Sequence, residues 1–189
     1  MSETGTENSL TNARRYRIHT DGGCRRNPGL GGWGAVLQIV ESNADGETIV
    51  KEAETKGAEP QTTNNRMELI AAIKSLECLS DKSMPVTVVS DSEYLVKGMN
   101  EWINGWIRRG WRNGKGKPVE NLDLWQQLDT VAQVFHEIRW EWIKGHAGHP
   151  LNERADQLAN AAMDALEAKL KARRKLRSPQ GRAVMVKTA

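Results

Sequence analysis

The chain has 189 residues, two cysteines and a net charge of +3. This length suits one domain with a substantial core, and no apolar run approaches the roughly 20 residues that cross a bilayer, so we expect no membrane partner. Cys24 and Cys78 suggest no disulfide framework and form no Cys-x-x-Cys pair, which argues against structural zinc. Together with a polar N-terminus that lacks the apolar segment of a signal peptide, they predict a cytoplasmic protein.

The charges are distributed unevenly along the chain. Residues 168–189 contain eight bases and no acids, residues 102–117 contain five bases and no acids, and the rest of the chain is net acidic. Two basic segments on an acidic body indicate a polyanionic partner held near carboxylates. For the C-terminal run taken alone, a solubilising tail is the simpler explanation.

A disordered lead segment is predicted at residues 1–13, and a strand follows it. Residues 16–21 alternate between two kinds of side chain, as a two-faced strand requires. The run ends on Asp21, directly before two glycines. An Asp-Gly step is most often only a turn signal, so this acid by itself is weak evidence for a functional site.

Two further strands are predicted next. Residues 24–32 form a glycine-rich loop, which lacks the Gly-Lys-Ser/Thr ending of a nucleotide-binding P-loop. Strands are predicted at residues 33–40 and 47–57, and turn-forming residues at 42–46 join them as a hairpin. The first three strands are therefore expected to form an antiparallel meander.

A helix is predicted after Thr63, because this N-cap residue precedes apolar side chains at the spacing of one buried stripe. Asn64 and Glu68 lie one turn apart on a different face of that helix. The next strand, residues 86–91, is almost continuously apolar, as expected in the middle of a sheet, and it ends on Asp91. A short helix is predicted around residues 94–100.

The second half of the chain alternates between helices and strands. The segment 102–118 is rich in glycine, tryptophan and base, and an amphipathic helix is predicted at residues 121–135. A fifth strand is predicted at residues 137–144, followed by a flexible His/Gly loop at 145–149. A final helix begins at Pro150 and is expected to run into the basic tail. This order predicts an α/β fold with a mixed sheet and helices on its faces.

Four acids are hard to explain as surface decoration, namely Asp21, Glu68, Asp91 and Asp156. Asp21 and Asp91 end strands that look central, and in parallel neighbouring strands their carboxylates would lie within a few ångströms. Clustered carboxylates raise one another's pKa, and a hard divalent cation such as Mg²⁺ relieves the repulsion. Two such ions roughly 3.5–4 Å apart can support hydrolysis of a phosphodiester. The alternative is that each acid caps a helix or pairs with a base.

Five motifs occur in order along the chain. They are Thr20-Asp21-Gly22-Gly23-Cys24 with Asn27-Pro28-Gly29, then Thr62-Thr63-Asn64-Asn65-Arg66-Met67-Glu68-Leu69, then Ser90-Asp91-Ser92, then Trp142-Ile143-Lys144-Gly145-His146-Ala147-Gly148-His149, and Asn152-Glu153-Arg154-Ala155-Asp156. Together they resemble ribonuclease H of type 1, over about residues 15–165. The resemblance implies the ribonuclease H-like fold, a five-stranded mixed sheet of three antiparallel and two parallel strands flanked by helices.

The same resemblance implies an endonuclease that hydrolyses the RNA strand of RNA–DNA hybrids to 5′-phosphate and 3′-hydroxyl ends. The metal ligands carried over are Asp21, Glu68, Asp91 and Asp156, which would hold two Mg²⁺ ions, with Mn²⁺ as an alternative. Asp21 would bridge both ions. His146 would assist proton transfer or product departure, and Asn152 would help orient the His146 loop and Asp156.

The substrate contacts implied by the resemblance come from two regions. In the first region, four residues resemble those that line the minor groove of the hybrid, where 2′-hydroxyls distinguish RNA from DNA. They are Cys24, Asn27, Asn64 and Asn65. Thr63 resembles a contact to a DNA phosphate. The segment 102–118 resembles the family's basic protrusion, which tracks the DNA strand.

Within this protrusion the candidate substrate contacts are Trp102, Trp106, Arg108 and Arg109. Bases neutralise phosphates, and tryptophans offer flat surfaces to sugars. The alternative for the tryptophans is packing beneath the protrusion, which Trp111 fits best. Trp140 and Trp142 on the fifth strand are predicted to be core residues.

Three features depart from the family pattern. Gln61 stands where many relatives have a phosphate-binding arginine, and Glu93 stands where relatives often have glutamine. The basic tail is longer than a minimal enzyme needs, and we hypothesise that it adds nonspecific affinity. The predicted organisation is a lead segment at 1–13, a catalytic domain at 14–166 and a basic extension at 167–189.

The leading hypothesis is thus a monomeric, metal-dependent ribonuclease H whose partner is an RNA–DNA hybrid, with no obligate protein partner. Two alternatives remain. One is a nuclease of the wider superfamily that acts on DNA, and the other is a catalytically silent hybrid-binding module. Retention of all four acids argues against a silent binder, because a protein that binds phosphates gains nothing from buried negative charge.

Overall fold

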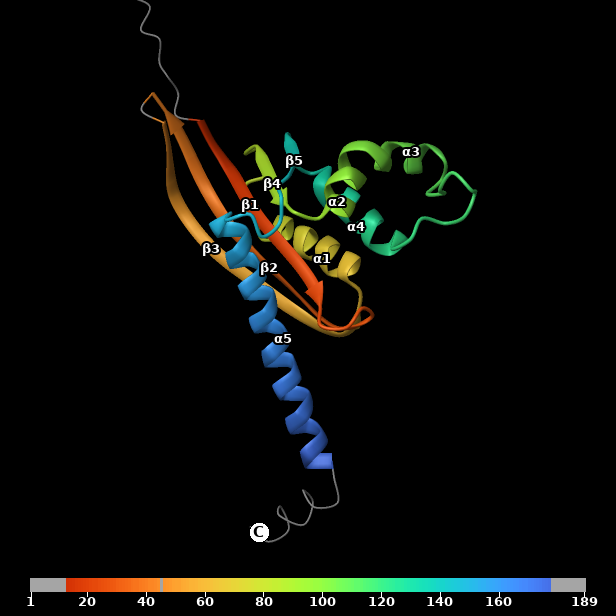
Figure 1. Cartoon of the computed structure of the whole chain (residues 1–189). Coiled ribbons are helices and arrows are strands. Elements are labelled where there is room, and N and C mark those ends of the chain that lie inside the picture. The colour runs from red at the N-terminus through yellow and green to blue at the C-terminus, as the bar shows by residue number, and fades with distance from the viewer. Residues whose placement is uncertain (1–12, 45, 178–189) are drawn as a thin grey trace, which may run out of the picture.

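The computed structural model describes residues 13–44 and 46–177 (Figure 1). The strands are β1 (Ala13–Cys24), β2 (Gly29–Asn43), β3 (Gly46–Thr62), β4 (Val86–Ser90) and β5 (Ile138–Trp142). The helices are α1 (Asn64–Glu77), α2 (Glu93–Lys97), η1 (Gly98–Trp102, a π-helical turn), α3 (Ile103–Arg108), α4 (Leu122–Ala132) and α5 (Pro150–Arg177). Most of the predicted lead segment lies outside the described residues, as do residues 178–189 of the predicted extension.

The five strands form one mixed sheet in the order β3-β2-β1-β4-β5. β1, β2 and β3 pair antiparallel, as the predicted meander requires, and β4 and β5 continue the sheet in parallel from β1. The predicted five-stranded mixed sheet is therefore confirmed. β1 is the central strand, and its parallel register pairs Thr20 with Ser90, so that Asp21 and Asp91 follow at the same edge.

Helices α1 and α5 cover opposite faces of the sheet, and consecutive glycines of β2 show this. A Cβ on Gly31 would meet the Met67 side chain of α1, whereas a Cβ on Gly32 would lie 2.4 Å from the backbone oxygen of Ala159 in α5. α4 packs beside α1, and α5 crosses the sheet and continues past its end (Figure 1). The carboxylates described below lie where β1, β4 and α1 meet.

The predicted glycine-rich loop is shorter than residues 24–32, because β2 begins at Gly29. These glycines belong to a strand that α5 approaches closely. Gly34 shows the same approach, because a Cβ on this residue would lie 2.3 Å from the backbone oxygen of Ala155. Glycine in a strand often marks such a close backbone approach. A single sequence does not separate this role from a loop.

The other predicted elements are present with shifted ends. Thr63 caps α1, with its hydroxyl accepting a hydrogen bond from the Arg66 backbone, as predicted. The predicted helix at 94–100 is α2 followed by η1, and α5 runs to Arg177 as expected. No described helix has both the length and the apolar character that a membrane span needs.

The core lies between the sheet and the α1–α4 layer. Its largest fully buried side chains include Trp125, Ile18 and Leu69. Trp140 is buried as predicted, but the prediction for Trp142 is wrong, because this side chain is 49 % exposed. Trp142 shares the face of Trp140, but it is the last residue of this edge strand, where that face is no longer covered, and its indole donates a hydrogen bond to the Asp91 carbonyl, 3.0 Å away.

Candidate functional site

Three carboxylates from separate elements converge at the edge of the sheet. Asp21 of β1, Glu68 of α1 and Asp91 after β4 each offer an oxygen atom, and these atoms lie within 4.8 Å of one another. The three residues are widely separated in the sequence, so only the fold brings them together. Like-charged groups at this distance repel strongly when water is excluded.

Small residues allow the three elements to approach so closely. A Cβ on Gly22 would lie 2.4 Å from the Met67 carbonyl carbon, so α1 contacts β1 at backbone distance just before Glu68. A Cβ on Gly145 would lie 2.4 Å from an Asp91 carboxylate oxygen. Glycine at both positions therefore leaves room for the carboxylates.

The electrostatic setting disfavours negative charge on this cluster. Burial, followed by the charges of Asp91 and Asp156, raises the pKa of Asp21 to about 7, although a hydrogen bond from the Gly22 backbone opposes the shift. Burial, with the charges of Asp21 and Asp91, raises the pKa of Glu68 well above its usual value. Glu68 is 9 % exposed, and its Oε2 has no hydrogen-bond partner among the described residues.

The donor set fits a hard divalent cation. Carboxylate oxygens are the ligands that Mg²⁺ and Mn²⁺ prefer, and the unpartnered Glu68 Oε2 supplies a buried oxygen that a cation can satisfy. A cation also removes the repulsion that raises the pKa values of Asp21 and Glu68. The residues present therefore fit the predicted metal centre.

The other predicted members of the site lie around the three carboxylates. Asp156 on α5 is near enough to act on the Asp21 charge but is outside the tight cluster, and its Oδ1 accepts a 2.8 Å hydrogen bond from Asn160. Asn152 is buried, and its Nδ2 donates to Asp91 Oδ2 over 3.2 Å. The structure thus pairs Asn152 with Asp91, whereas the sequence pointed to Asp156.

His146 is exposed on the loop between β5 and α5 and has φ of 51°. This left-handed backbone is uncommon for a residue other than glycine. The charge of His146 acts on Asp21 in the direction opposite to the neighbouring carboxylates. The loop therefore holds the imidazole near the cluster while leaving it in solvent.

The predicted groove-facing residues form one connected surface beside the carboxylates. The Cys24 backbone donates to Asn64 Oδ1 over 2.8 Å, and the Asn64 backbone donates to Asn27 Oδ1 over 3.3 Å. Thr63, as the N-cap, and Asn65 are the neighbours of Asn64 at the start of α1. The turn after β1 and the start of α1 thus present these polar groups together.

The predicted protrusion, residues 102–118, begins at Trp102, the last residue of η1, and contains α3 and the loop that follows; it extends to one side of the sheet (Figure 1). Trp102 and Trp106 are half-buried in an aromatic cluster with Tyr94 and Trp125, in which the Trp106 and Trp125 ring centres lie 5.2 Å apart. Trp111 packs against the core, as its alternative interpretation predicted. The bases of the segment are exposed, namely Arg108, Arg109, Arg112, Lys115 and Lys117.

Comparison with known proteins decides the family. The sequence profile of RNase H matches residues 13–164 of the chain. The chain belongs to the RNase H family. It is 57 % identical over 145 residues to the Ribonuclease H of Ruegeria sp. (strain TM1040), which covers 77 % of this chain and 88 % of that protein. It is 56 % identical over 144 residues to the Ribonuclease H of Paracoccus denitrificans (strain Pd 1222), covering 76 % and 89 %.

Solved structures agree with this assignment. LC9-RNase H1, described as a type 1 RNase H with the type 2 active-site motif, superposes with a TM-score of 0.68 at 32 % identity, covering 81 % of this chain and 74 % of that one. LC11-RNase H1, solved in complex with an RNA/DNA hybrid, gives a TM-score of 0.54 at 27 % identity, covering 80 % and 99 %. The predicted family and the predicted RNase H-like fold are confirmed.

Gln61 and Glu93, which depart from the family pattern, are not part of the carboxylate cluster of this RNase H. Glu93 forms an ion pair with Lys97 one turn later on α2, with 2.6 Å between the charged atoms. Gln61, near the end of β3, lines a cleft beside α5 that is described below. The sequence did not reveal that Gly22 and Gly145 leave room for the carboxylates. The only signal was the position of each glycine, next to Asp21 or His146.

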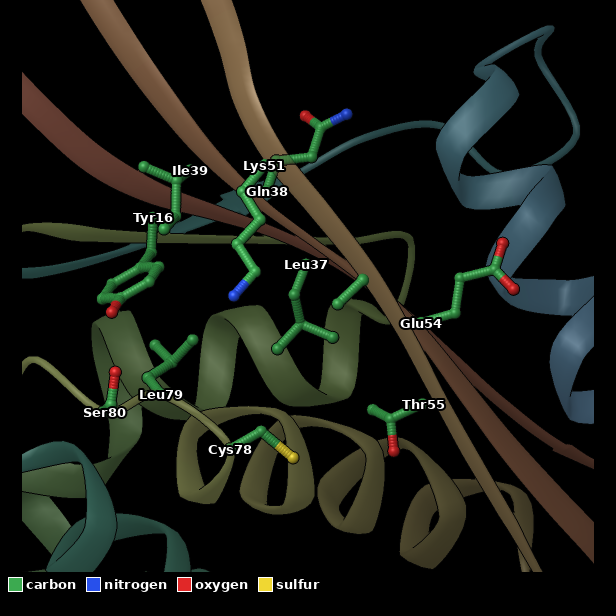
Figure 2. A pocket seen from close by; sticks show the side chains of 11 residues that line it. Tyr16, Leu37, Gln38, Ile39, Lys51, Glu54, Thr55, Cys78, Leu79 and Ser80 are labelled. Carbon is green, nitrogen blue, oxygen red and sulfur yellow. The ribbon is translucent and has the colours of Figure 1, made fainter.

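A separate hollow of about 180 Å³ lies between β2, β3 and the end of α1 (Figure 2). Tyr16, Leu37 and Leu79 line it, together with the exposed Cys78. None of the three clustered carboxylates reaches this hollow. It is therefore not part of the candidate site.

Proposed function

We propose that this RNase H is an endonuclease that hydrolyses the RNA strand of RNA–DNA hybrids in a reaction that requires a divalent cation, Mg²⁺ or Mn²⁺. The observation that carries the proposal is the convergence of Asp21, Glu68 and Asp91 within 4.8 Å in a protein of this family. Such a cluster disfavours its own negative charge, which a cation-binding role explains and a purely structural role does not.

Asp21, Glu68, Asp91 and Asp156 are the proposed ligands of two ions. When bound, the cations supply positive charge that polarises the scissile phosphate and activates water. Asp21 lies on the central strand, which pairs with β4 and contacts α1, so it would be the ligand that helps hold both ions. In-line attack by water that breaks the bond to the 3′ oxygen leaves 5′-phosphate and 3′-hydroxyl ends.

Neighbouring side chains have orienting and proton-handling roles in this proposal. Asn152 is a positioning residue, because its buried amide holds one oxygen of Asp91 through the 3.2 Å hydrogen bond. His146, exposed on the adjacent loop, is proposed to move a proton during departure of the product. An imidazole titrates near neutral pH, which suits that task.

Discrimination of RNA from DNA is assigned to the surface that begins beside the carboxylates. Cys24, Asn27, Asn64 and Asn65 are proposed to meet the minor groove, in which 2′-hydroxyls are displayed. The hydrogen bonds that link the first three of these residues support a preformed surface. Thr63 at the N-terminus of α1 is proposed to contact a phosphate of the DNA strand.

The protrusion is proposed to follow the DNA strand. Its exposed bases, Arg108 and Arg109 among them, are suited to phosphates. Trp102 and Trp106 are proposed to present a ring edge to the sugars, and the packing of both rings against Tyr94 and Trp125 would hold that edge still.

A single gel assay tests the proposed function. An end-labelled RNA–DNA hybrid, duplex DNA and duplex RNA are incubated with the protein in Mg²⁺, in Mn²⁺ and in EDTA. We expect cleavage of the RNA strand of the hybrid only, and only with a divalent cation. Equal cleavage of duplex DNA would favour a DNA nuclease, and hybrid binding without cleavage would favour a silent binding module.

Location and assembly are further parts of the proposal. Cys24 and Cys78 are both free, as a reducing compartment such as the cytoplasm favours. We expect a monomer with no obligate protein partner, since the three clustered carboxylates come from one chain. Light scattering at micromolar concentration measures the mass directly, and a dimer mass would contradict this expectation.

A further inference from the structure

A cleft of about 690 Å³ separates the C-terminal part of α5 from the turn between β1 and β2. Arg25 and Arg26 line it on the turn, and Lys171 and Arg174 line it on the helix, with Glu167 as the one acid. The helical wall lies beyond residue 164, where the match to the RNase H profile ends. The cleft is therefore built partly by a segment outside the shared family domain.

The spacing of the helical residues explains how this wall forms. Glu167, Leu170, Lys171 and Arg174 follow one another at intervals of three, one and three residues, which places them on one face of a helix. Arg25 fixes that face against the turn through ion pairs with Asp164 and with Glu167, the latter at 2.6 Å. The extended α5 is thus tied to the body of the domain.

The charges in the cleft are only partly compensated. Arg25 is paired as described, and Lys171 pairs with Glu167 at 2.9 Å. Among the described residues, Arg26 and Arg174 have no acidic partner, and they stand on opposite walls. The helix dipole explains bases in the last turn of α5, but it does not explain Arg26, which lies on another element. Two unpaired guanidinium groups facing one cleft favour an anion with several oxygens, such as a phosphodiester.

The turn that carries these bases also belongs to the proposed substrate surface. Arg25 and Arg26 lie between Cys24 and Asn27, which connect through Asn64 to the start of α1. A nucleic-acid backbone that continues from this surface along the β1–β2 turn would reach the cleft next. The 13 residues from 165 to 177 extend the helix by about 20 Å in that direction, at 1.5 Å per residue.

We propose that the cleft between the β1–β2 turn and α5 binds backbone phosphates of the RNA–DNA hybrid and so lengthens its contact with the enzyme beyond the shared domain. This inference rests on the proposed function. It assigns the helical part of the extension a specific contact, with Arg26 and Arg174 as the main determinants.

The test compares Arg26→Gln/Arg174→Gln with a matched control, Lys51→Gln/Lys56→Gln, which removes two exposed bases from β3 outside the cleft. Dissociation constants for a fluorescent hybrid are measured by anisotropy in EDTA across a salt series. For the cleft variant we expect roughly tenfold weaker binding at low salt and a salt slope smaller by about 1–2, as for two lost phosphate contacts. The control is expected to bind like wild type.

Wild-type affinity and slope in the cleft variant would overturn the proposal, as would an equal loss in the control. Arg174→Gln alone, on the exposed helix, provides a second variant with a smaller expected loss in the same direction. Cleavage of the hybrid by the wild-type protein in Mg²⁺ is scored separately. If the wild type cleaves and the cleft variant binds normally, only the cleft proposal fails, whereas a wild type that does not cleave contradicts the proposed function.

Discussion

The carboxylate cluster and the basic surfaces carry opposite charges and are built in opposite ways. Asp21, Glu68 and Asp91 come from three separate elements and lie within 4.8 Å of one another, with Glu68 buried and the two aspartates partly buried. The bases of the protrusion, and those of α5 from Lys169 to Lys175, come from continuous stretches of sequence and are exposed.

Burial decides how strongly like charges act on each other in these two regions. In water, side chains several ångströms apart are screened, whereas in a partly dry cluster the same repulsion shifts pKa values by whole units. The cluster therefore costs stability until a cation neutralises it. The exposed basic surfaces cost the folded protein little stability, and the salt concentration controls how strongly they attract phosphates.

Asp21→Asn, in the carboxylate cluster, is expected to have the largest effect, and that effect is on the cleavage rate. Loss of the proposed bridging ligand should lower cleavage in Mg²⁺ by about 10³-fold or more, equivalent to several kcal/mol of transition-state stabilisation. Binding of the hybrid should be unchanged or tighter, because one buried negative charge near the phosphates is removed. Cleavage rates and anisotropy measure the two quantities. Asp129→Asn, on α4 outside the cluster, is the control, and comparable cleavage by Asp21→Asn and wild type would refute the assignment of the ligands.

The pH dependence of stability tests the cost of the buried charges. Because the pKa of Asp21 is raised to about 7 in the folded state, the folded protein binds more protons than the unfolded chain between about pH 4 and 7. Stability in EDTA should therefore be greatest at low pH within this range and should fall by about 2–3 kcal/mol from pH 5 to pH 8 through Asp21 alone.

Urea denaturation at the two pH values measures this change. Glu68, whose pKa is also raised, adds to the effect in the same direction. Mg²⁺ should restore more stability at pH 8 than at pH 5, because the ion binds the charged carboxylates. A protein that is equally stable in EDTA at both pH values, and whose Asp21→Asn variant is also unchanged, would show that the cluster carries no such cost.

Gly22→Ala tests the packing that brings the carboxylates together. Its Cβ would meet the α1 backbone at 2.4 Å, so we expect a loss of about 1–3 kcal/mol in stability and a displaced Glu68. Gly23→Ala is the matched control, since an added Cβ there has no atom within 4 Å. Thermal unfolding and cleavage rates should separate the two variants. Equal behaviour would mean that α1 shifts away from β1 without consequence.

Arg108→Gln/Arg109→Gln, in the exposed basic protrusion, is expected to have the smallest effect, and that effect is on hybrid binding. We expect about tenfold weaker hybrid binding at low salt, a salt slope reduced by about 1–2, and unchanged protein stability. A salt series of anisotropy measurements checks the first two, and thermal unfolding checks the third. An unchanged slope would show that these exposed bases do not contact phosphates.

Much of the fold follows from local patterns in the sequence. Alternation around Tyr16, the apolar run at 86–90 and the Thr63 cap predicted β1, β4 and α1 close to their observed positions. Patterns failed where distant segments meet. Gly32 and Gly34 were assigned to a loop or left unexplained because α5, which requires them, lies more than 100 residues later. Trp142 was assigned to the core because alternation places it on the same face as Trp140 but does not reveal where along the strand that face stops being covered.

By itself, the sequence determined the family motifs, the order of elements and the two basic segments, because these are properties of neighbouring residues. Only the tertiary structure decided that three carboxylates share one partly dry space, that Asn152 holds Asp91 rather than Asp156, and that α5 forms a cleft with Arg25 and Arg26. Those facts depend on strand register and on how closely backbones pack. Both arise from contacts between residues far apart in the chain, and no local pattern encodes them.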